Sequence, residues 1–211
     1  MDASFFRFDA YVDEHADEYV RRLRALCRIP SIAAVGGAAM ADAAALVAEL
    51  AATAGLDVTL ESAGGPPVVL CGGGAGPRGL LLYNHYDVQP PDPLDEWRTP
   101  PFAAEIIDGV LYARGVADNK SNVVARLAAI EAYGATFGAL PLRVACVFEG
   151  EEEVGSPHLG QFAADHVTLL RAMDGCVWES GQKTFCPSRT RGNSSRGARL
   201  AARLRWRGNP A

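Results

Sequence analysis

The sequence contains no apolar run that approaches the roughly 18 residues of a membrane-spanning helix. Its first residues lack the basic and then apolar order of a secretory signal. The five cysteines are odd in number and scattered, and no CxxC motif occurs, so neither a disulfide framework nor a thiolate zinc site is indicated. These absences predict a cytoplasmic protein without a membrane partner. The hydrophobic content of 49% over 211 residues is sufficient for a packed core.

The formal net charge of −5 hides an uneven distribution. Residues 1–183 contain all 25 acidic residues and 13 of the 20 basic ones, whereas residues 184–211 contain seven arginines and no acid. An acidic body argues against nucleic acid as the main partner. We therefore predict a domain over residues 1–183, followed by a basic tail over residues 184–211 that is disordered or read out of frame. A genuine basic arm for nucleic acid or a protein partner is the alternative.

Hydrophobic periodicity predicts an alternation of strands and helices. Apolar residues at helical spacing predict helices over residues 8–29, 38–54 and 121–137. Short apolar or alternating runs predict strands over residues 56–61, 67–71, 80–83, 142–148 and 175–178, and a hairpin over residues 105–113. Ser156 and Pro157 resemble the start of a further helix. This order predicts an α/β fold with helices on both faces of a central sheet.

Acidic and imidazole side chains follow the predicted strands or precede a helix. His85 and Asp87 come after the strand at residues 80–83, Asp118 precedes a helix, and residues 149–153 follow the strand at 142–148. Alone, each has an ordinary explanation: a surface histidine in a turn, a helix cap, or a solvated acidic loop. Because ligands gather beyond the carboxyl ends of strands in open α/β sheets, the combination favours one shared site. Glu179 follows another short apolar stretch and is a weaker candidate.

A single imidazole among several carboxylates suits zinc, manganese or cobalt in a hydrolytic site. Paired ions about 3.5–4 Å apart stabilise both the attacking and the leaving oxygen of such a reaction. The spacing of His85 and Asp87 also has a reason, because residues i and i+2 of an extended segment point the same way. Asp87 can then hold the imidazole from behind while the other ring nitrogen binds a metal.

Four stretches carry a resemblance to a known family: residues 82–90 (LYNHYDVQP), 97–102, 109–121 and 148–159. The sequence resembles the co-catalytic metallopeptidase family that includes carnosinase-type dipeptidases, glutamate carboxypeptidase, acetylornithine deacetylase and succinyl-diaminopimelate desuccinylase. The HYDVQP wording is most similar to the dipeptidase branch. The resemblance extends over roughly residues 5–183.

The resemblance implies a zinc-peptidase-like catalytic domain, a three-layer sandwich with a central, mostly parallel sheet, that is incomplete here. It implies a metal-dependent hydrolase that cleaves the amide bond of dipeptides or similar small peptides with a metal-activated water. The cofactors would be two divalent ions, zinc first, with manganese or cobalt as alternatives. An N-acyl amino-acid deacylase of the same family and a catalytically inactive fragment are the alternative functions.

The resemblance also implies a role for individual residues. His85, Asp118 and Glu153 would bind metal, with Asp118 bridging the two ions through a segment whose peptide bond to the next residue is cis. Glu179 would supply a further carboxylate ligand, and Asp174 is the alternative at that position.

Two further residues would assist the metals: Asp87 would orient His85, and Glu152 would be the general base. Glu152 and Glu153 are chosen over the preceding pair because the family's two glutamates stand directly before a short x-Gly-Ser, here residues 154–156.

The chain also departs from this family. Members are about twice as long, and they insert a lid and dimerisation domain before returning to supply a last histidine ligand. Nothing after Glu179 resembles those parts, and His15, His158 and His166 do not match the late ligand. We therefore expect a truncated and impaired chain that lacks one metal ligand and the family's dimer surface.

Overall fold

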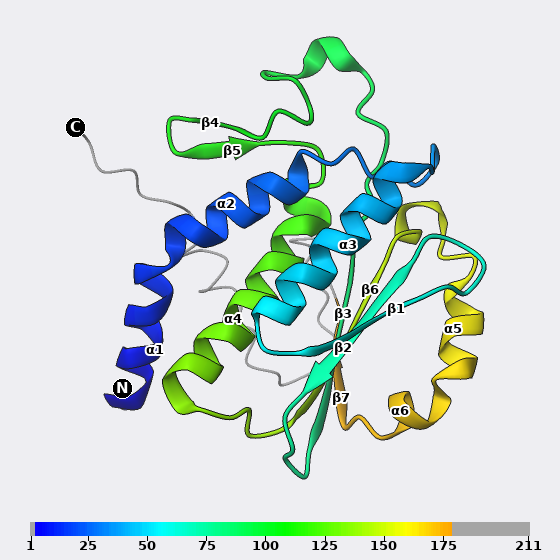
Figure 1. The fold of residues 1–211 in the computed structure, drawn as a ribbon. Coiled ribbons are helices and arrows are strands. Elements are labelled where there is room, and N and C mark those ends of the chain that lie inside the picture. Colours follow the sequence, from blue (N-terminus) through cyan, green and yellow to red (C-terminus); the bar gives the residue numbers. More distant parts are fainter. Residues whose placement is uncertain (1–2, 179–211) are drawn as a thin grey trace, which may run out of the picture.

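A five-stranded sheet lies between two layers of helices in the computed structural model, which describes residues 3–178 (Figure 1). The helices are α1 (Ala3–Glu14), α2 (Ala16–Cys27), α3 (Ala38–Thr53), α4 (Ser121–Phe137), α5 (Leu159–Asp165) and α6 (Val167–Arg171). The strands are β1 (Asp57–Glu61), β2 (Val68–Gly73), β3 (Gly79–His85), β4 (Glu105–Ile107), β5 (Val110–Tyr112), β6 (Arg143–Glu149) and β7 (Gly175–Val177). None of the helices within residues 3–178 is both long and apolar enough to cross a membrane.

The strands of the large sheet follow the order β1-β2-β6-β3-β7. Because β2 is antiparallel to both of its neighbours while β6, β3 and β7 are parallel, four of the five strands run in one direction. The sheet is therefore mixed but mostly parallel, as predicted. The register pairs His85 of β3 with Glu149 of β6, so both strands end at the same edge of the sheet. That shared edge brings together the loops that follow them.

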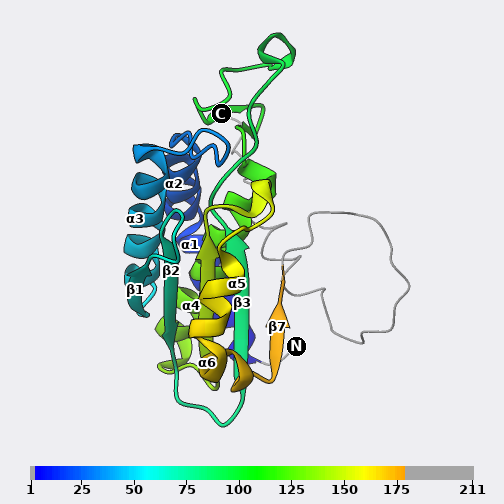
Figure 2. The same ribbon diagram turned by 90° about the vertical axis from the view of Figure 1, so that its right-hand side faces the viewer.

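Alternating side chains of the strands form two apolar cores. On one face, Leu82 and Cys146 pack with residues of α2, α3 and α4, and Figure 2 shows α1–α4 stacked on that side. On the other face, Tyr83 and Val147 pack against Phe162 of α5. Helices thus cover both faces, which confirms the predicted three-layer α/β architecture.

The short hairpin β4–β5 stands apart from the large sheet, above the edge where β3 and β6 end (Figure 1). Asp108 and Gly109, which connect its strands, both have positive φ, 51° and 75°. A two-residue connection with both φ values positive matches the twist of the flanking strands, which is why Asp-Gly predicts a hairpin.

Two predicted helices differ from the structure. The helix expected over residues 8–29 is two helices, α1 and α2, that meet at His15. The His15 ring stacks on Tyr11, and its Nδ1 lies 2.9 Å from the Tyr11 carbonyl oxygen, so the side chain competes for a main-chain acceptor of the helix. The helix predicted to start at Ser156 is present but begins later, at Leu159, and the Ser156 hydroxyl donates to Glu149 instead of capping it.

Candidate metal centre

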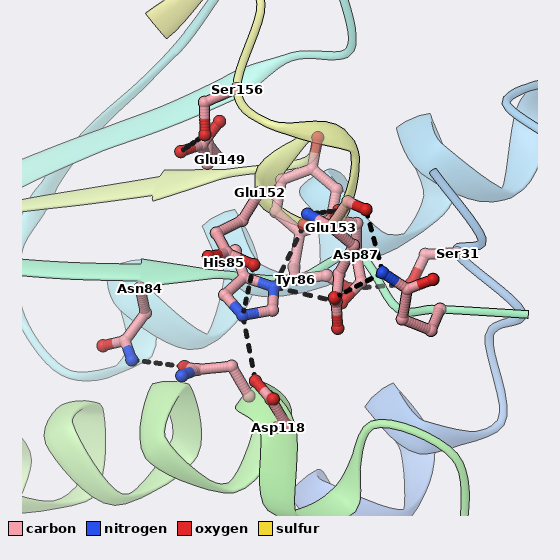
Figure 3. Close-up of polar contacts among 12 residues, drawn as sticks. Ser31, Asn84, His85, Tyr86, Asp87, Asp118, Glu149, Glu152, Glu153 and Ser156 are labelled. Atoms are coloured by element: carbon pink, nitrogen blue, oxygen red, sulfur yellow. Dashed lines mark hydrogen bonds and ion pairs between the residues drawn. The ribbon is translucent and has the colours of Figure 1, made fainter. Parts of the chain in front are cut away.

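His85 is the last residue of β3, and its side chain has no exposed surface (Figure 3). Its Nδ1 lies 3.1 Å from Asp87 Oδ1 and 3.2 Å from the Asp87 carbonyl oxygen. Its Nε2 points the other way, 3.2 Å from Asp118 Oδ1. A hydrogen bond at one ring nitrogen selects the tautomer and orientation of the other, which is the arrangement that metal-binding histidines use.

Asp87 connects the end of β3 to the acidic loop after β6. One carboxylate oxygen lies against the His85 ring, and the other, Oδ2, accepts a hydrogen bond of 3.0 Å from the Glu153 main-chain N–H. The Asp87 side chain is completely buried. A single carboxylate therefore fixes the imidazole relative to the acidic loop.

Asp118 lies just before α4 and has an extended backbone conformation, with φ −129° and ψ 95°. The peptide bond between Asp118 and Asn119 is cis, as the resemblance implied. The buried Asn119 side-chain carbonyl accepts a hydrogen bond from the Asn84 side chain of β3, whereas the Asp118 side chain is 64% exposed. The segment is thus attached to the sheet on one side and open to solvent on the other.

The acidic loop brings two carboxylates towards the same imidazole. Glu152 Oε2 lies 3.7 Å from His85 Nε2, and one potential ligand atom each from His85, Glu152 and Glu153 lies within 4.8 Å of the others. The Gln89 side-chain amide donates to both the main-chain oxygen and Oε2 of Glu153, at 2.9 Å each. Figure 3 shows His85, Asp118 and the pair Glu152 and Glu153 converging from separate segments of the chain.

The electrostatics of this cluster favour a cation. The pKa of the Glu153 carboxyl is raised, mainly by burial. The charges of Asp118 and Asp87 also raise it, whereas the Gln89 hydrogen bond and the nearby His85 lower it. Carboxylates that are crowded in this way repel one another unless a positive charge lies between them. One imidazole and several carboxylate oxygens are also ligands that zinc accepts, so the donor set fits a metal ion of this kind.

The structure thus brings five predicted site residues together: His85, Asp87, Asp118, Glu152 and Glu153. Their chemical roles stay predictions. Glu179 lies outside the described residues.

Asp174, the alternative to Glu179, lies elsewhere. Its carboxylate accepts a hydrogen bond from the Gly79 N–H at 2.7 Å, beside Arg78. Gly79 begins β3 and His85 ends it, so the length of the strand separates Asp174 from the imidazole by roughly 20 Å. Glu151 also faces away from the cluster, because its carboxylate lies 2.8 Å from His158 Nδ1.

Two further residues, Gln89 and Glu149, support the acidic loop. Gln89 belongs to the quoted HYDVQP motif, but its hydrogen bonds to Glu153 were not foreseen. Glu149 is a buried carboxylate that accepts hydrogen bonds from the Tyr83 hydroxyl and, at 2.8 Å, from the Ser156 hydroxyl. The available signal was the position of Glu149 at the end of a buried strand, where an unpaired carboxylate would be costly.

Comparison with known proteins identifies the family. Residues 81–202, more than half of the chain, match the model of peptidase family M20/M25/M40. The chain belongs to this family. The match confirms the family that the motifs indicate. It also extends beyond residue 183, and the domain boundary there stays a prediction.

Two enzymes are similar to this chain over part of their length. Human Beta-Ala-His dipeptidase is 37% identical over 137 residues, which are 61% of this chain and 27% of the human protein. Succinyl-diaminopimelate desuccinylase of Dechloromonas aromatica (strain RCB) is 43% identical over 100 residues, 46% of this chain and 26% of that protein.

The crystal structure of human carnosine dipeptidase 1 resembles the model with a TM-score of 0.74 and 30% identity, covering 81% of this chain and 40% of that one. This family member therefore spans about a quarter to two fifths of the length of the relatives compared here.

Proposed function

We propose that this chain is the metal-binding part of a hydrolase that cleaves the amide bond of dipeptides or similar small peptides. The observation that supports the proposal is the convergence of the three loops. His85 Nε2 faces both Asp118 and Glu152, 3.2 and 3.7 Å from their carboxylate oxygens, and Glu153 belongs to the same group. These residues come from positions 85, 118 and 152–153, so the fold itself has to bring them together.

Divalent ions, with zinc first, would be held by His85, Asp118 and Glu153, and by Glu179 from outside the described residues. We assign two ions because the family resemblance implies them, with Asp118, whose side chain is 64% exposed, as the shared ligand. When bound, the metals would polarise the substrate carbonyl and lower the pKa of water. Asp87 would keep the Nε2 of His85 directed at the site, since it occupies the Nδ1 side of the ring.

Glu152 would act as the general base. Its carboxylate is 34% exposed and lies within 3.7 Å of the imidazole, so it is at the site but still accessible to water. It would take a proton from the attacking water and deliver that proton to the leaving amine nitrogen. General acid–base catalysis of this kind contributes about 10²–10⁴-fold to the rate.

A second substrate class is an N-acyl amino acid. The 43% identity to a succinyl-diaminopimelate desuccinylase over 100 residues favours it, and the reaction would break the same type of bond. We rank the dipeptide first, and the longer match to Beta-Ala-His dipeptidase and the structural similarity to carnosine dipeptidase 1 support this order.

Metal analysis combined with two assays tests the proposal. The purified chain is loaded with zinc, dialysed and assayed with β-alanyl-histidine and with an N-succinyl amino acid. We expect bound zinc and faster hydrolysis of the dipeptide, and we expect His85→Ala to lose most of the zinc. His166→Ala is the matched control, because that histidine pairs with Glu61 away from the site. Zinc retained by His85→Ala would refute the assignment, and zinc without turnover would leave a metal-binding fragment.

A further inference from the structure

Lys120 has an unusual environment for a lysine. Its side chain is completely buried, and its ammonium group donates hydrogen bonds to the carbonyl oxygens of Leu26 (3.0 Å) and Ile29 (2.8 Å). Leu26 belongs to the last turn of α2, and the carbonyls at the end of a helix carry partial negative charge that suits a cation. The ammonium therefore closes the carboxyl end of α2.

The charge of Lys120 is costly where it lies. An ammonium group that leaves water loses most of its hydration, and the Lys120 ammonium donates to two main-chain carbonyls rather than to a carboxylate. A neutral side chain of similar length would fill the same space without that cost. The hydrogen bonds of the ammonium to Leu26 and Ile29 have an explanation if they fix the position of the segment that carries Lys120.

That segment contains Asp118. The Lys120 main-chain N–H donates to the Gly115 carbonyl at 2.9 Å and so closes the turn in which Asp118 lies. The Lys120 side chain then connects this closed turn to Leu26 and Ile29, which precede it by 94 and 91 positions in the chain. The Asp118 side chain is itself largely exposed, and its contact within the site is with His85 Nε2, at 3.2 Å.

The other half of the site is attached to the same place. The Ser31 hydroxyl donates to the Tyr86 carbonyl at 2.7 Å, and the Val88 N–H donates to the Ser31 carbonyl at 2.9 Å. Ser31 and Tyr86 lie beside His85 and Asp87 in Figure 3. Residues 26–31 therefore contact both the turn with Asp118 and the loop with His85.

We propose that Lys120 is a positioning residue that sets the Asp118 carboxylate at its distance from His85, by anchoring the Asp118 turn to the end of α2. The inference rests on the proposed metal site. It assigns to Lys120 an effect on metal binding that is transmitted through the main chain, without contact between the ammonium and the metal.

The test measures zinc affinity by competition with a chromogenic chelator, together with the visible absorption spectrum of the cobalt-loaded protein, which depends on ligand arrangement. Lys120→Met removes the ammonium and keeps a similar volume. We expect zinc affinity to fall about ten- to hundredfold, as for other residues that orient metal ligands, and the cobalt spectrum to change. Val47→Ala is the control, because it opens a cavity in the buried face of α3, away from the site, and should affect stability alone.

The outcomes separate the two proposals. If Lys120→Met does not fold, Lys120→Gln replaces it, because its shorter amide keeps a donor for one carbonyl. A folded Lys120 variant with unchanged affinity and spectrum overturns the inference, as does a fall in affinity that Val47→Ala shares without a spectral change. Asp118→Asn tests the site itself. If it binds zinc like the original chain, or if that chain binds none, the metal site fails and the inference fails with it.

Discussion

The two sides of the candidate metal centre differ in exposure. The side chains of His85 and Asp87 are completely buried, whereas those of Asp118 and Glu152 are 64% and 34% exposed. On the buried side, both carboxylate oxygens of Asp87 have a partner within the fold, the His85 ring and the Glu153 main-chain N–H. On the open side, carboxylates face solvent and one another.

This difference indicates that the two sides have separate functions: the buried side orients the imidazole, and the open side presents charge to ligands. The buried side is arranged before any ligand arrives, because the packing of β3 and the hydrogen bonds of Asp87 determine where the imidazole points. The open side holds the charges that a cation and a substrate would meet. Substitutions on the open side should therefore alter function at little cost in stability, and substitutions on the buried side should alter both.

The largest effect is expected for Glu152→Gln on the open side. An amide cannot act as a base, so the rate of dipeptide hydrolysis should fall about 10²–10⁴-fold. Zinc content should stay the same, and the free energy of unfolding should change by no more than about 0.5 kcal/mol, as for most surface substitutions. Steady-state kinetics, metal analysis and urea unfolding of the same preparation check the three expectations. Retained activity would mean that another group is the base.

Asp118→Asn should have the next largest effect and separates binding from folding most clearly. Loss of a bridging carboxylate should weaken zinc binding by at least about a hundredfold, beyond the range seen for outer-shell partners. The stability of the metal-free protein should be unchanged, because the side chain is largely exposed. Isothermal titration with zinc and urea unfolding in EDTA measure the two. A large loss of metal-free stability would show that the open side is not independent of the fold.

Asp87→Asn tests the buried side. The amide places an N–H group where a carboxylate oxygen faced either the His85 ring or the Glu153 main-chain N–H. That buried donor then loses its acceptor. We expect a loss of about 1–3 kcal/mol in the free energy of unfolding, and about ten- to hundredfold weaker zinc binding. Asp165→Asn, at an exposed position on α5, is the matched control. Weaker zinc binding with unchanged stability would contradict the expectation that substitutions on the buried side alter both.

The parts of the fold that could be predicted from the sequence are those set by residues close together in the chain. The apolar run of β3 ends abruptly in Asn84 and His85, which marks both the strand and its functional end. Asp108 and Gly109 select a hairpin turn by their backbone conformation alone, and Gly55 ends α3 with a φ of +83°. The convergence of the loops was also accessible, because parallel strands place their carboxyl ends at one edge.

The unforeseen features depend on contacts between distant residues. Lysine is almost never fully buried, so nothing in the sequence marks Lys120 as a core residue. Its carbonyl partners, Leu26 and Ile29, are more than 90 residues away, and Gln89 and Glu153 are 64 residues apart. Such pairs appear only when the helices and loops have packed. A sequence can therefore indicate candidate metal ligands and a local partner such as Asp87, but not the distant residues that hold them in place.

Glu149 should give the smallest effect and extends the comparison to pH. Burial raises the pKa of its carboxyl, while the hydrogen bonds from Tyr83 and Ser156 lower it. A raised pKa means that the folded state favours the protonated form. The stability that this group contributes is complete below its unfolded pKa and is lost as pH rises through its folded pKa.

In metal-free protein, we therefore expect the original chain to lose stability relative to Glu149→Gln as pH rises through that range, and the difference to become constant at higher pH. Urea unfolding of both proteins in EDTA, at intervals from acidic to neutral pH, measures the difference, and effects of the other carboxyl groups cancel in it. A difference that does not change with pH would show that the hydrogen bonds only offset burial, and a difference that shifts in favour of the original chain as pH rises would show that they outweigh it. In that second case, Glu149 would stabilise the acidic loop as an ion.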